Sequence, residues 1–291
     1  MALASVRRAG QAEPEMSAVT HDQARAALRA AAERTARLIE GLDDIDRPIP
    51  GSEWTVGEAA THLLVGLRGY TASARGEIGP EWRQHIPDTP RYPERVSAVT
   101  AATLRAEPRR DAATLARLLQ ESVDIFLAAT EGQPADAGIA APWYGDGATL
   151  ALSDATCLLL GEQVVHGYDI ARALRRPWPI EETDACLIFQ AVTTMMPRVL
   201  NPEAAGSASV ACDIRLRGGP RAVLTVSDGS ARVEPWTSQP VDCHLSADPA
   251  AFLLLGYGRI NQWAAIARGQ LLAWGRKPWR ALRLRGYFFN P

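Results

Sequence analysis

The chain has 291 residues, of which 47% are hydrophobic and 22% are charged, and its formal net charge is -2 at pH 7. This composition is typical of a folded globular protein and excludes global disorder, and the small net charge gives no indication of a nucleic-acid partner. The length allows one large domain or two of ordinary size. Because no run of about 18 apolar residues is present, no membrane span is expected.

The cysteines and the first residues bear on the cellular compartment. No two cysteines form a CxxC pair, and they lie far apart, at Cys157, Cys186, Cys212 and Cys243. We therefore expect reduced, mostly buried thiols and a cytoplasmic protein. Residues 1–20 contain two arginines but no apolar stretch of the length that a signal peptide needs. We expect a disordered lead-in there.

Residues 21–203 are predicted to form a helical domain. Apolar residues recur at three- and four-residue spacing, which predicts long helices at 24–42, 55–74, 111–130, 153–174 and 181–200. Ser52 or Thr55 is expected to cap the second helix, and Thr55 and Glu58 have the spacing of a capping box. Ser153 or Asp154 is expected to cap the fourth. Residues 79–93 and 132–147 are rich in turn formers and aromatic residues and are predicted to be loops.

The hydrophobic period changes after residue 203. Short alternating segments separated by glycine-containing turns predict strands at 209–217, 222–226, 231–234 and 241–245. A helix is expected to follow from about Ser246 to Leu255, and then a last helical stretch and a tail. We therefore interpret residues 204–291 as a small α+β domain.

The most informative residues are Glu162 and His166, with His62 earlier in the chain. On a helix, Glu162 and His166 lie one turn apart on the same face. With His62 they would make three N/O ligands, which suits a catalytic zinc because the fourth tetrahedral position stays open. Ordinary alternatives remain: a solvent-facing Glu–His pair, and a lone histidine on a helix in a core or surface role.

Two segments resemble a known family. WTVGEAATHL at residues 54–63 is similar to a segment of the DinB-like metalloenzyme superfamily, and EQVVHGYDIA at residues 162–171 is similar to one in its mycothiol-dependent maleylpyruvate isomerase branch. The resemblance covers residues 20–290. It implies a DinB-like four-helix-bundle domain at 21–203, followed by an α+β domain at 204–291 similar to sterol carrier protein 2.

The resemblance also implies the chemistry. His62, Glu162 and His166 would bind one zinc ion per chain, and mycothiol would bind through sulfur at the open position. Zinc would hold that sulfur as a thiolate near neutral pH. The implied activity is thiol (mycothiol) S-transfer or thiol-assisted isomerisation of a small electrophile such as maleylpyruvate. The implied partners are a small-molecule substrate and a low-molecular-weight thiol, in a monomer or weak homodimer.

Other functions remain open. Relatives of this architecture also exchange mycothiol for another thiol, such as ergothioneine, on an intermediate of lincosamide-type antibiotic biosynthesis. The C-terminal domain alone would suit a non-catalytic carrier of apolar ligands. The same three ligands would also suit a zinc hydrolase that uses a metal-bound water.

Further candidates surround this set. Asp169 follows His166 by three residues and is a candidate to orient it, or else to pair with Arg172 on the surface. Arg259 lies where the resembling family has an arginine that faces the active site. It is a candidate to hold a carboxylate of the substrate or thiol cofactor, or else a helix-end arginine.

Aromatic and basic loop residues are weaker candidates. Trp143 and Tyr144, together with Trp82, are expected to line a pocket for the thiol cofactor, or else to pack the loops against the domain. Arg91 and Arg95 are candidates to contact a carboxylate. His21, His85 and His244 have no partner at a recognisable spacing.

Overall fold

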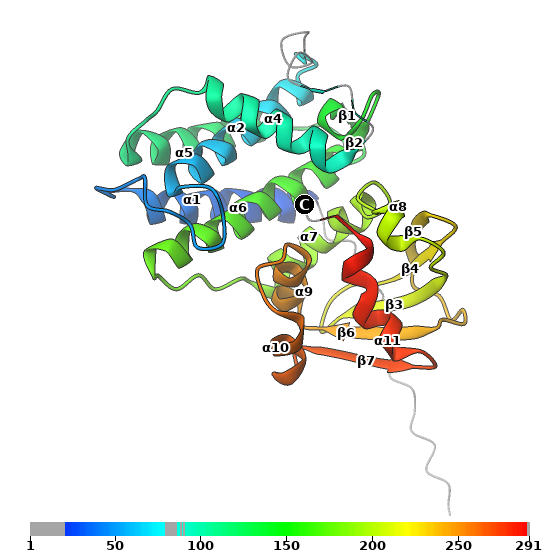
Figure 1. Ribbon diagram of the computed structural model, residues 1–291. Helices are drawn as coiled ribbons and strands as arrows, with labels where there is room; N and C mark the ends of the chain where they lie inside the picture. Colours follow the sequence, from blue (N-terminus) through cyan, green and yellow to red (C-terminus); the bar gives the residue numbers. More distant parts are fainter. Residues whose placement is uncertain (1–20, 79–85, 88, 90, 290–291) are drawn as a thin grey trace, which may run out of the picture.

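The computed structural model describes residues 21–78, 86–87, 89 and 91–289. The predicted disordered lead-in at 1–20, Trp82 and His85 lie outside these residues. A helical region and a region built on a sheet lie on opposite sides of the molecule, with helix α7, Glu182–Met195, between them (Figure 1). The predicted fold class, a helical domain followed by a helix-plus-sheet region, is confirmed.

Four long helices form the helical region. They are α1 (His21–Ile39), α2 (Val56–Ala74), α5 (Ala112–Ala129) and α6 (Leu152–Leu174). Both α1 and α2 pack against both α5 and α6, which closes the helices into a bundle. Because α6 also packs against α7, it is buried on most sides. A helix at the centre of a bundle is therefore the element that carries Glu162 and His166.

The helix ends confirm one capping prediction and correct another. Thr55 accepts a hydrogen bond from the Glu58 backbone, and the Glu58 carboxylate accepts one from the Thr55 backbone, so the predicted capping box is present. Helix α6, however, begins at Leu152, and its N-cap is Ala151, without a side-chain hydrogen bond. Asp154 lies in the first turn, where its charge favours the helix N-terminus.

The loop predictions missed two short elements and the start of one helix. Residues 132–147 include strand β1 (Gly138–Ala140), which pairs antiparallel with β2 (Thr149–Ala151), and the 3-10 helix η1 (Pro142–Tyr144). Helix α4, Tyr92–Ala106, begins inside the other predicted loop, at residues 79–93. Its buried residues are Arg95 and Thr103, so the sequence carries no strong apolar stripe that would have indicated a helix.

The second region is a five-stranded mixed sheet in the order β5-β4-β3-β6-β7. Strands β3 and β6 are parallel, and the other neighbours are antiparallel. The strands are β3 (Val210–Leu216), β4 (Arg221–Ser227), β5 (Ser230–Pro235), β6 (Cys243–Ala247) and β7 (Leu271–Gly275). Four of these strands overlap the predicted segments.

Strand β7 corrects the prediction of a last helical stretch. The segment Leu271–Gly275 has few β-branched residues and lies at the edge of the sheet, so its structure depends on pairing with β6. The remaining elements are short helices: α8 (Pro202–Ala205), α9 (Pro249–Gly256), α10 (Gln262–Ala267), α11 (Pro278–Arg283) and the 3-10 helix η2 (Leu284–Tyr287).

Two hydrophobic cores divide the molecule, and α7 belongs to both. Its residues Ala185 and Ile188 pack in the core of the helical bundle. Its residue Phe189 packs in the core of the sheet region. A domain limit at 203/204 stays a prediction, because α7 joins the two cores before it. No described helix combines the length and the apolar character needed to cross a membrane.

Candidate metal centre

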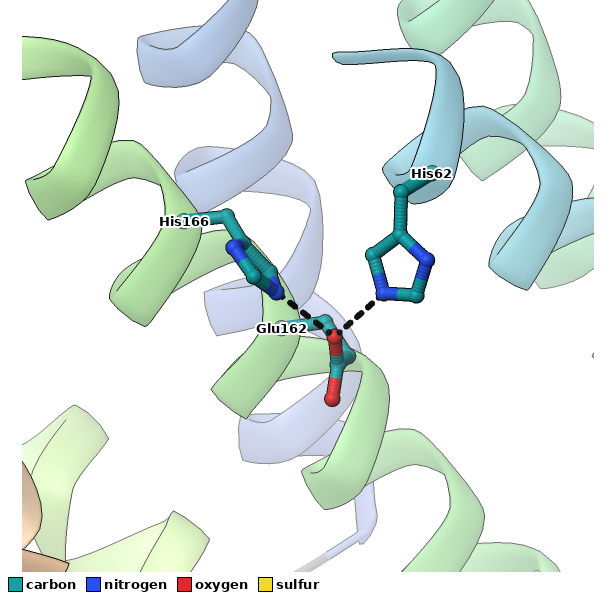
Figure 2. Close-up of side chains that lie close together, drawn as sticks. All are labelled: His62, Glu162 and His166. Carbon is teal, nitrogen blue, oxygen red and sulfur yellow. Dashed lines mark hydrogen bonds and ion pairs between the residues drawn. The ribbon is translucent and has the colours of Figure 1, made fainter. Parts of the chain in front are cut away.

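Three side chains from two helices converge at one point. His62 comes from α2, and Glu162 and His166 come from α6; both rings point to one Glu162 oxygen (Figure 2). The Glu162 Oε2 atom lies 3.1 Å from His62 Nε2 and 3.3 Å from His166 Nε2. One ligand atom from each residue lies within 4.8 Å of the others. The structure thus places residue 62 beside residues 162 and 166, which chain position alone left open.

Packing around α6 fixes these positions. An added Cβ on Gly161 would lie 3.2 Å from the Ile188 side chain of α7, and one on Gly167 would overlap the Trp178 ring. The Trp178 indole also donates a hydrogen bond to the Val164 carbonyl at 3.0 Å. A glycine next to Glu162 and another next to His166 therefore allow close packing, which fixes the position of α6.

Asp169 and Arg259 extend the cluster toward the sheet region. The Asp169 carboxylate, almost fully buried, lies 3.6 Å from His166 Nδ1. It accepts hydrogen bonds from Arg259 Nε at 3.0 Å and Nη2 at 2.7 Å. Arg259 follows α9 and also donates to the Tyr257 carbonyl at 2.7 Å. The two candidates thus pair with each other, and they connect the sheet region to His166.

A tryptophan packs over both histidines. The Trp54 ring centroid lies 4.9 Å from that of His62 and 5.5 Å from that of His166. The histidine side chains are 22% and 14% exposed, and that of Glu162 is 33% exposed. The cluster is therefore largely sheltered from solvent, and Glu162 is its most exposed member. Sequence reasoning used Trp54 as part of a motif and missed this contact, because it depends on the angle between α2 and the preceding turn.

The electrostatics are those of mutually stabilised charges. Burial alone would raise the pKa of Glu162, but hydrogen bonds to His166 and His62 outweigh burial and hold this pKa well below its usual range. Burial alone would lower the pKa of His166, but the Asp169 and Glu162 carboxylates raise it to about 9. The pKa of Asp169 is lowered, because hydrogen bonds to His166 and Arg259 outweigh its burial.

This donor set fits a zinc ion. Two imidazole nitrogens and one carboxylate oxygen are common zinc ligands, and three protein ligands leave a fourth tetrahedral position open. The Nδ1 of His166 faces Asp169, so its Nε2 is directed to the cluster, which is the arrangement found when a carboxylate orients a metal-binding histidine. The alternative of a solvent-facing Glu–His pair does not account for the third residue or for the buried Asp169.

The aromatic candidates lie in different settings. Tyr144 shares a hydrogen bond of 2.9 Å with Tyr70 and stacks on Tyr92 at a ring distance of 5.9 Å. It lines a cavity that also reaches Glu162. Trp143 packs edge-on against Tyr70 at 5.0 Å, and is not among the described residues that line this cavity. The thiol-binding role of both residues stays a prediction.

The two weaker arginine candidates pair with carboxylates outside the cluster. Arg91 forms exposed ion pairs with Glu94 and with Glu203 at 3.0 Å. Arg95, predicted in a loop, instead lies in helix α4, where it is buried and 3.6 Å from Asp146. Neither lines the cavity that reaches Glu162.

Sequence reasoning missed that cavity and a second polar cluster. The wall of the cavity is mostly apolar. The almost uniformly apolar sequence of helix α9 was the signal that could have indicated this cavity. In the second cluster, the buried Asp213 lies 2.6 Å from His244 Nδ1 and binds Arg221. His244 therefore has a partner, across the β3–β6 register rather than at a local spacing.

Comparisons with known proteins address the family. Residues 28–171 match the mycothiol maleylpyruvate isomerase N-terminal domain. The crystal structure of the mycothiol-dependent maleylpyruvate isomerase is 13% identical, with a TM-score of 0.50 over 94% of this chain and 96% of that chain. A histidine-to-alanine variant of that enzyme is 12% identical, with a TM-score of 0.50 and the same coverage. No curated protein matches this chain.

At these identities the structural likeness shows a shared fold. The similarity of residues 204–291 to sterol carrier protein 2 stays a prediction. The family match, by contrast, contains His62, Glu162 and His166 together with most of the bundle that positions them. The chain therefore belongs to the mycothiol maleylpyruvate isomerase family.

Proposed function

We propose that this protein is a zinc-dependent enzyme that uses a low-molecular-weight thiol, mycothiol, to isomerise a small electrophile or to transfer the thiol to it. The observation that carries the proposal is the convergence of His62, Glu162 and His166 within 4.8 Å. These residues lie inside the segment that matches the family. Maleylpyruvate is the first substrate to test, since it is named for the family and for the structural relative.

His62, Glu162 and His166 would hold the metal through Nε2, a carboxylate oxygen and Nε2. When bound, zinc would keep the thiol sulfur deprotonated near neutral pH, where a free thiol is mostly protonated. Asp169 would fix the orientation of the His166 ring, and Trp54 would restrict both rings by packing. The three candidate ligands lie on packed helices, which favours a preorganised site.

The isomerisation needs no oxidant or reductant. The thiol sulfur forms a bond to one carbon of a cis double bond, which becomes a single bond and can rotate. The carbon–sulfur bond then breaks, the trans double bond forms and the thiol is regenerated. In a transfer reaction the carbon–sulfur bond instead remains in the product. The chain's contribution is to place the electrophilic carbon beside the sulfur.

We assign Asp169 and Arg259 a positioning role at this site. Arg259 already binds Asp169 with two donors, which neutralises a buried carboxylate beside His166. This ion pair supports the predicted role of Asp169, which is to orient the His166 ring. The predicted contact of Arg259 with a carboxylate of the substrate or thiol remains part of the proposal.

The carrier and hydrolase alternatives make different predictions. A carrier would use the apolar cavity but has no need of the His62–Glu162–His166 cluster. A hydrolase would turn over without a thiol. Thiol exchange on a natural-product intermediate is a member of the same reaction class and predicts activity with a larger substrate and none with maleylpyruvate.

The experiment is a product assay on zinc-loaded protein prepared without a histidine tag. Maleylpyruvate is incubated with and without mycothiol, and ¹H NMR distinguishes the cis substrate, the trans product and the S-conjugate by their vinylic protons. We expect trans product or conjugate with mycothiol and zinc together, and loss of this activity in His62→Ala. The matched control is His21→Ala, because His21 contacts Thr156 outside the cluster. Turnover that is equal without thiol would contradict the proposal.

A further inference from the structure

One cavity joins the candidate metal centre to the sheet region. It has a volume of about 170 Å³ and is lined by Glu162, by Tyr92 and Tyr144 of the helical region, and by residues of α7, α9, the sheet and the C-terminal segment. Phe189, Val192 and Met195 form the α7 wall, and Phe252 and Leu255 form the α9 wall. The cavity therefore starts at a metal-ligand candidate and continues between the two regions.

The wall of this cavity is mostly apolar. Among the described residues that line it, Glu162 and Arg285 carry the charges, and most others are aliphatic or aromatic. Burial raises the pKa of Tyr92 and of Tyr257, so these phenols are neutral at physiological pH. A small dianion placed here would lose its hydration without gaining several cationic partners, which is unfavourable. A neutral apolar group would gain by the same desolvation.

The volume sets a size for the occupant. An apolar cavity of about 150 Å³ in a protein accommodates benzene, so a cavity of about 170 Å³ accommodates a chain or ring of about six to eight carbons. Mycothiol, a polar sugar conjugate, does not match this lining. Its sulfur would reach the cluster at the exposed part of the Glu162 side chain, which is 33% exposed.

We propose that the electrophile carries a neutral apolar tail of about six to eight carbons, which occupies this cavity while its electrophilic carbon lies beside His62, Glu162 and His166. The inference rests on the proposed function and names its substrate class. In the reaction, the thiol sulfur bonds to the β-carbon of an activated double bond and the thiol proton ends on the α-carbon. No redox change is involved.

Gly256 offers a way to fill the cavity without strain. It lines the cavity near the end of α9, and an added Cβ would meet no atom within 4 Å. The substitution Gly256→Leu therefore adds a four-carbon side chain at the cavity wall and suits a helix better than glycine does. Gly138→Leu is the matched control, because Gly138 in β1 also has open space around an added Cβ and is outside the cavity lining.

The first measurement is thiol addition to trans-alkenals with alkyl tails of one to nine carbons, using zinc-loaded protein and mycothiol. We expect kcat/KM to rise about fourfold per methylene and to level off at about six to eight carbons. In Gly256→Leu the rise should end about four carbons earlier, since the leucine side chain takes that space. Gly138→Leu should follow the wild type. A reaction whose kcat/KM is independent of tail length would overturn the inference and leave the proposed function standing.

The second measurement does not depend on activity. Binding of n-octanol, an unreactive probe, is followed by isothermal titration calorimetry on wild type, Gly138→Leu, Gly256→Leu and a second filling variant on the α7 wall, Val192→Phe. We expect saturable binding with a negative heat-capacity change in the first two proteins, weakened at least tenfold in the filling variants. If no alkenal reacts while maleylpyruvate does, the inference fails and the proposed function stands, and octanol binding tests the cavity independently of activity. Absent binding, or binding that neither filling variant weakens, would overturn the inference.

Discussion

Two carboxylate–histidine clusters of this protein differ in what completes them. Asp213 in the sheet contacts His244 at 2.6 Å and accepts two hydrogen bonds of 2.8 Å from Arg221. Glu162 in the helical bundle lies between two histidines, at 3.1 and 3.3 Å. A guanidinium is always protonated and balances its carboxylate permanently. A protonated imidazole can instead release its proton and bind a metal ion through the free nitrogen.

Burial follows the same division. Asp213 is 1% exposed, whereas the Glu162 side chain is 33% exposed and borders a cavity. Similar residue types thus form a closed structural cluster in one region and an open, ligand-ready cluster in the other. The comparison predicts opposite effects of substitution: loss of stability at Asp213, and loss of metal binding at Glu162.

The largest expected effect is zinc-dependent stabilisation. At a zinc concentration about a thousandfold above Kd, a ligand stabilises the native state by about 4 kcal/mol, and the thermal midpoint should rise by about 2 °C for each kcal/mol in a chain of this size. Scanning calorimetry of metal-free protein with added zinc should show this rise of about 8 °C in wild type and in Asp213→Asn. Glu162→Gln should lose it. A rise that persists in Glu162→Gln would contradict the assignment of the cluster.

The next effect is on folding stability, which Asp213→Asn should lower. Removing one partner of a buried ion pair costs about 3–5 kcal/mol, and because Arg221 and His244 remain partly exposed, we expect about 2–3 kcal/mol for Asp213→Asn. Urea unfolding of the metal-free proteins measures this free energy. The control is Glu121→Gln, whose exposed pair with Arg117 should contribute less than about 1 kcal/mol. Equal stabilities of Asp213→Asn and the control would remove the distinction between the clusters.

Asp169 sharpens the comparison, since it orients a histidine without belonging to the metal set. Replacing a carboxylate that orients a metal-binding histidine lowers metal affinity about 10- to 100-fold, and we expect this for Asp169→Asn. Competition with a chromophoric chelator gives the affinity. Asp154→Asn, a substitution at the start of the same helix, should leave the affinity unchanged. An unchanged affinity in Asp169→Asn would show that the contact with His166 has no role in binding.

The smallest expected effect concerns acid. Burial raises the pKa of Asp213, but the hydrogen bonds to Arg221 and His244 lower it further than burial raises it, so its folded-state pKa is below the usual value. A carboxylate with a lowered pKa stabilises the fold above its unfolded pKa of about 3.9, and this contribution is lost as pH falls through the folded pKa. The difference in unfolding free energy between wild type and Asp213→Asn should be constant from pH 7 to about 5.

Below about pH 4 that difference should shrink, by no more than about 1.4 kcal/mol per pH unit. Urea unfolding of both proteins at pH 5, 4 and 3 tests the sign. A difference that grows on acidification would mean that the Asp213 carboxylate is destabilised by its surroundings, contrary to the geometry of the cluster.

The two clusters also show what the sequence could and could not predict. Glu162 and His166 were recognisable because their spacing is local and one helical turn separates them. Their meeting with His62 came from the resemblance, since it depends on how α2 packs against α6. Asp213 and His244 gave no local signal, because the parallel pairing of β3 and β6 joins them.

Helices and strands were likewise predictable where their own sequence carries a pattern. Helices with strong apolar stripes and strands with clear alternation were predicted, together with the capping box at Thr55. Helix α4 and strand β7 were missed, because neither carries its own pattern and each is stabilised by packing or by a neighbouring strand. The Asp169–Arg259 pair joins two regions, so each residue was predicted as a candidate while their contact was not.

The most direct test of the central claim is metal content by elemental analysis of protein purified without a histidine tag, wild type beside His166→Ala, with circular dichroism to show that both are folded. The account predicts about one zinc per chain in wild type and none in the variant. No zinc in the wild type after zinc is supplied and the excess removed, or equal zinc in both proteins, would contradict it.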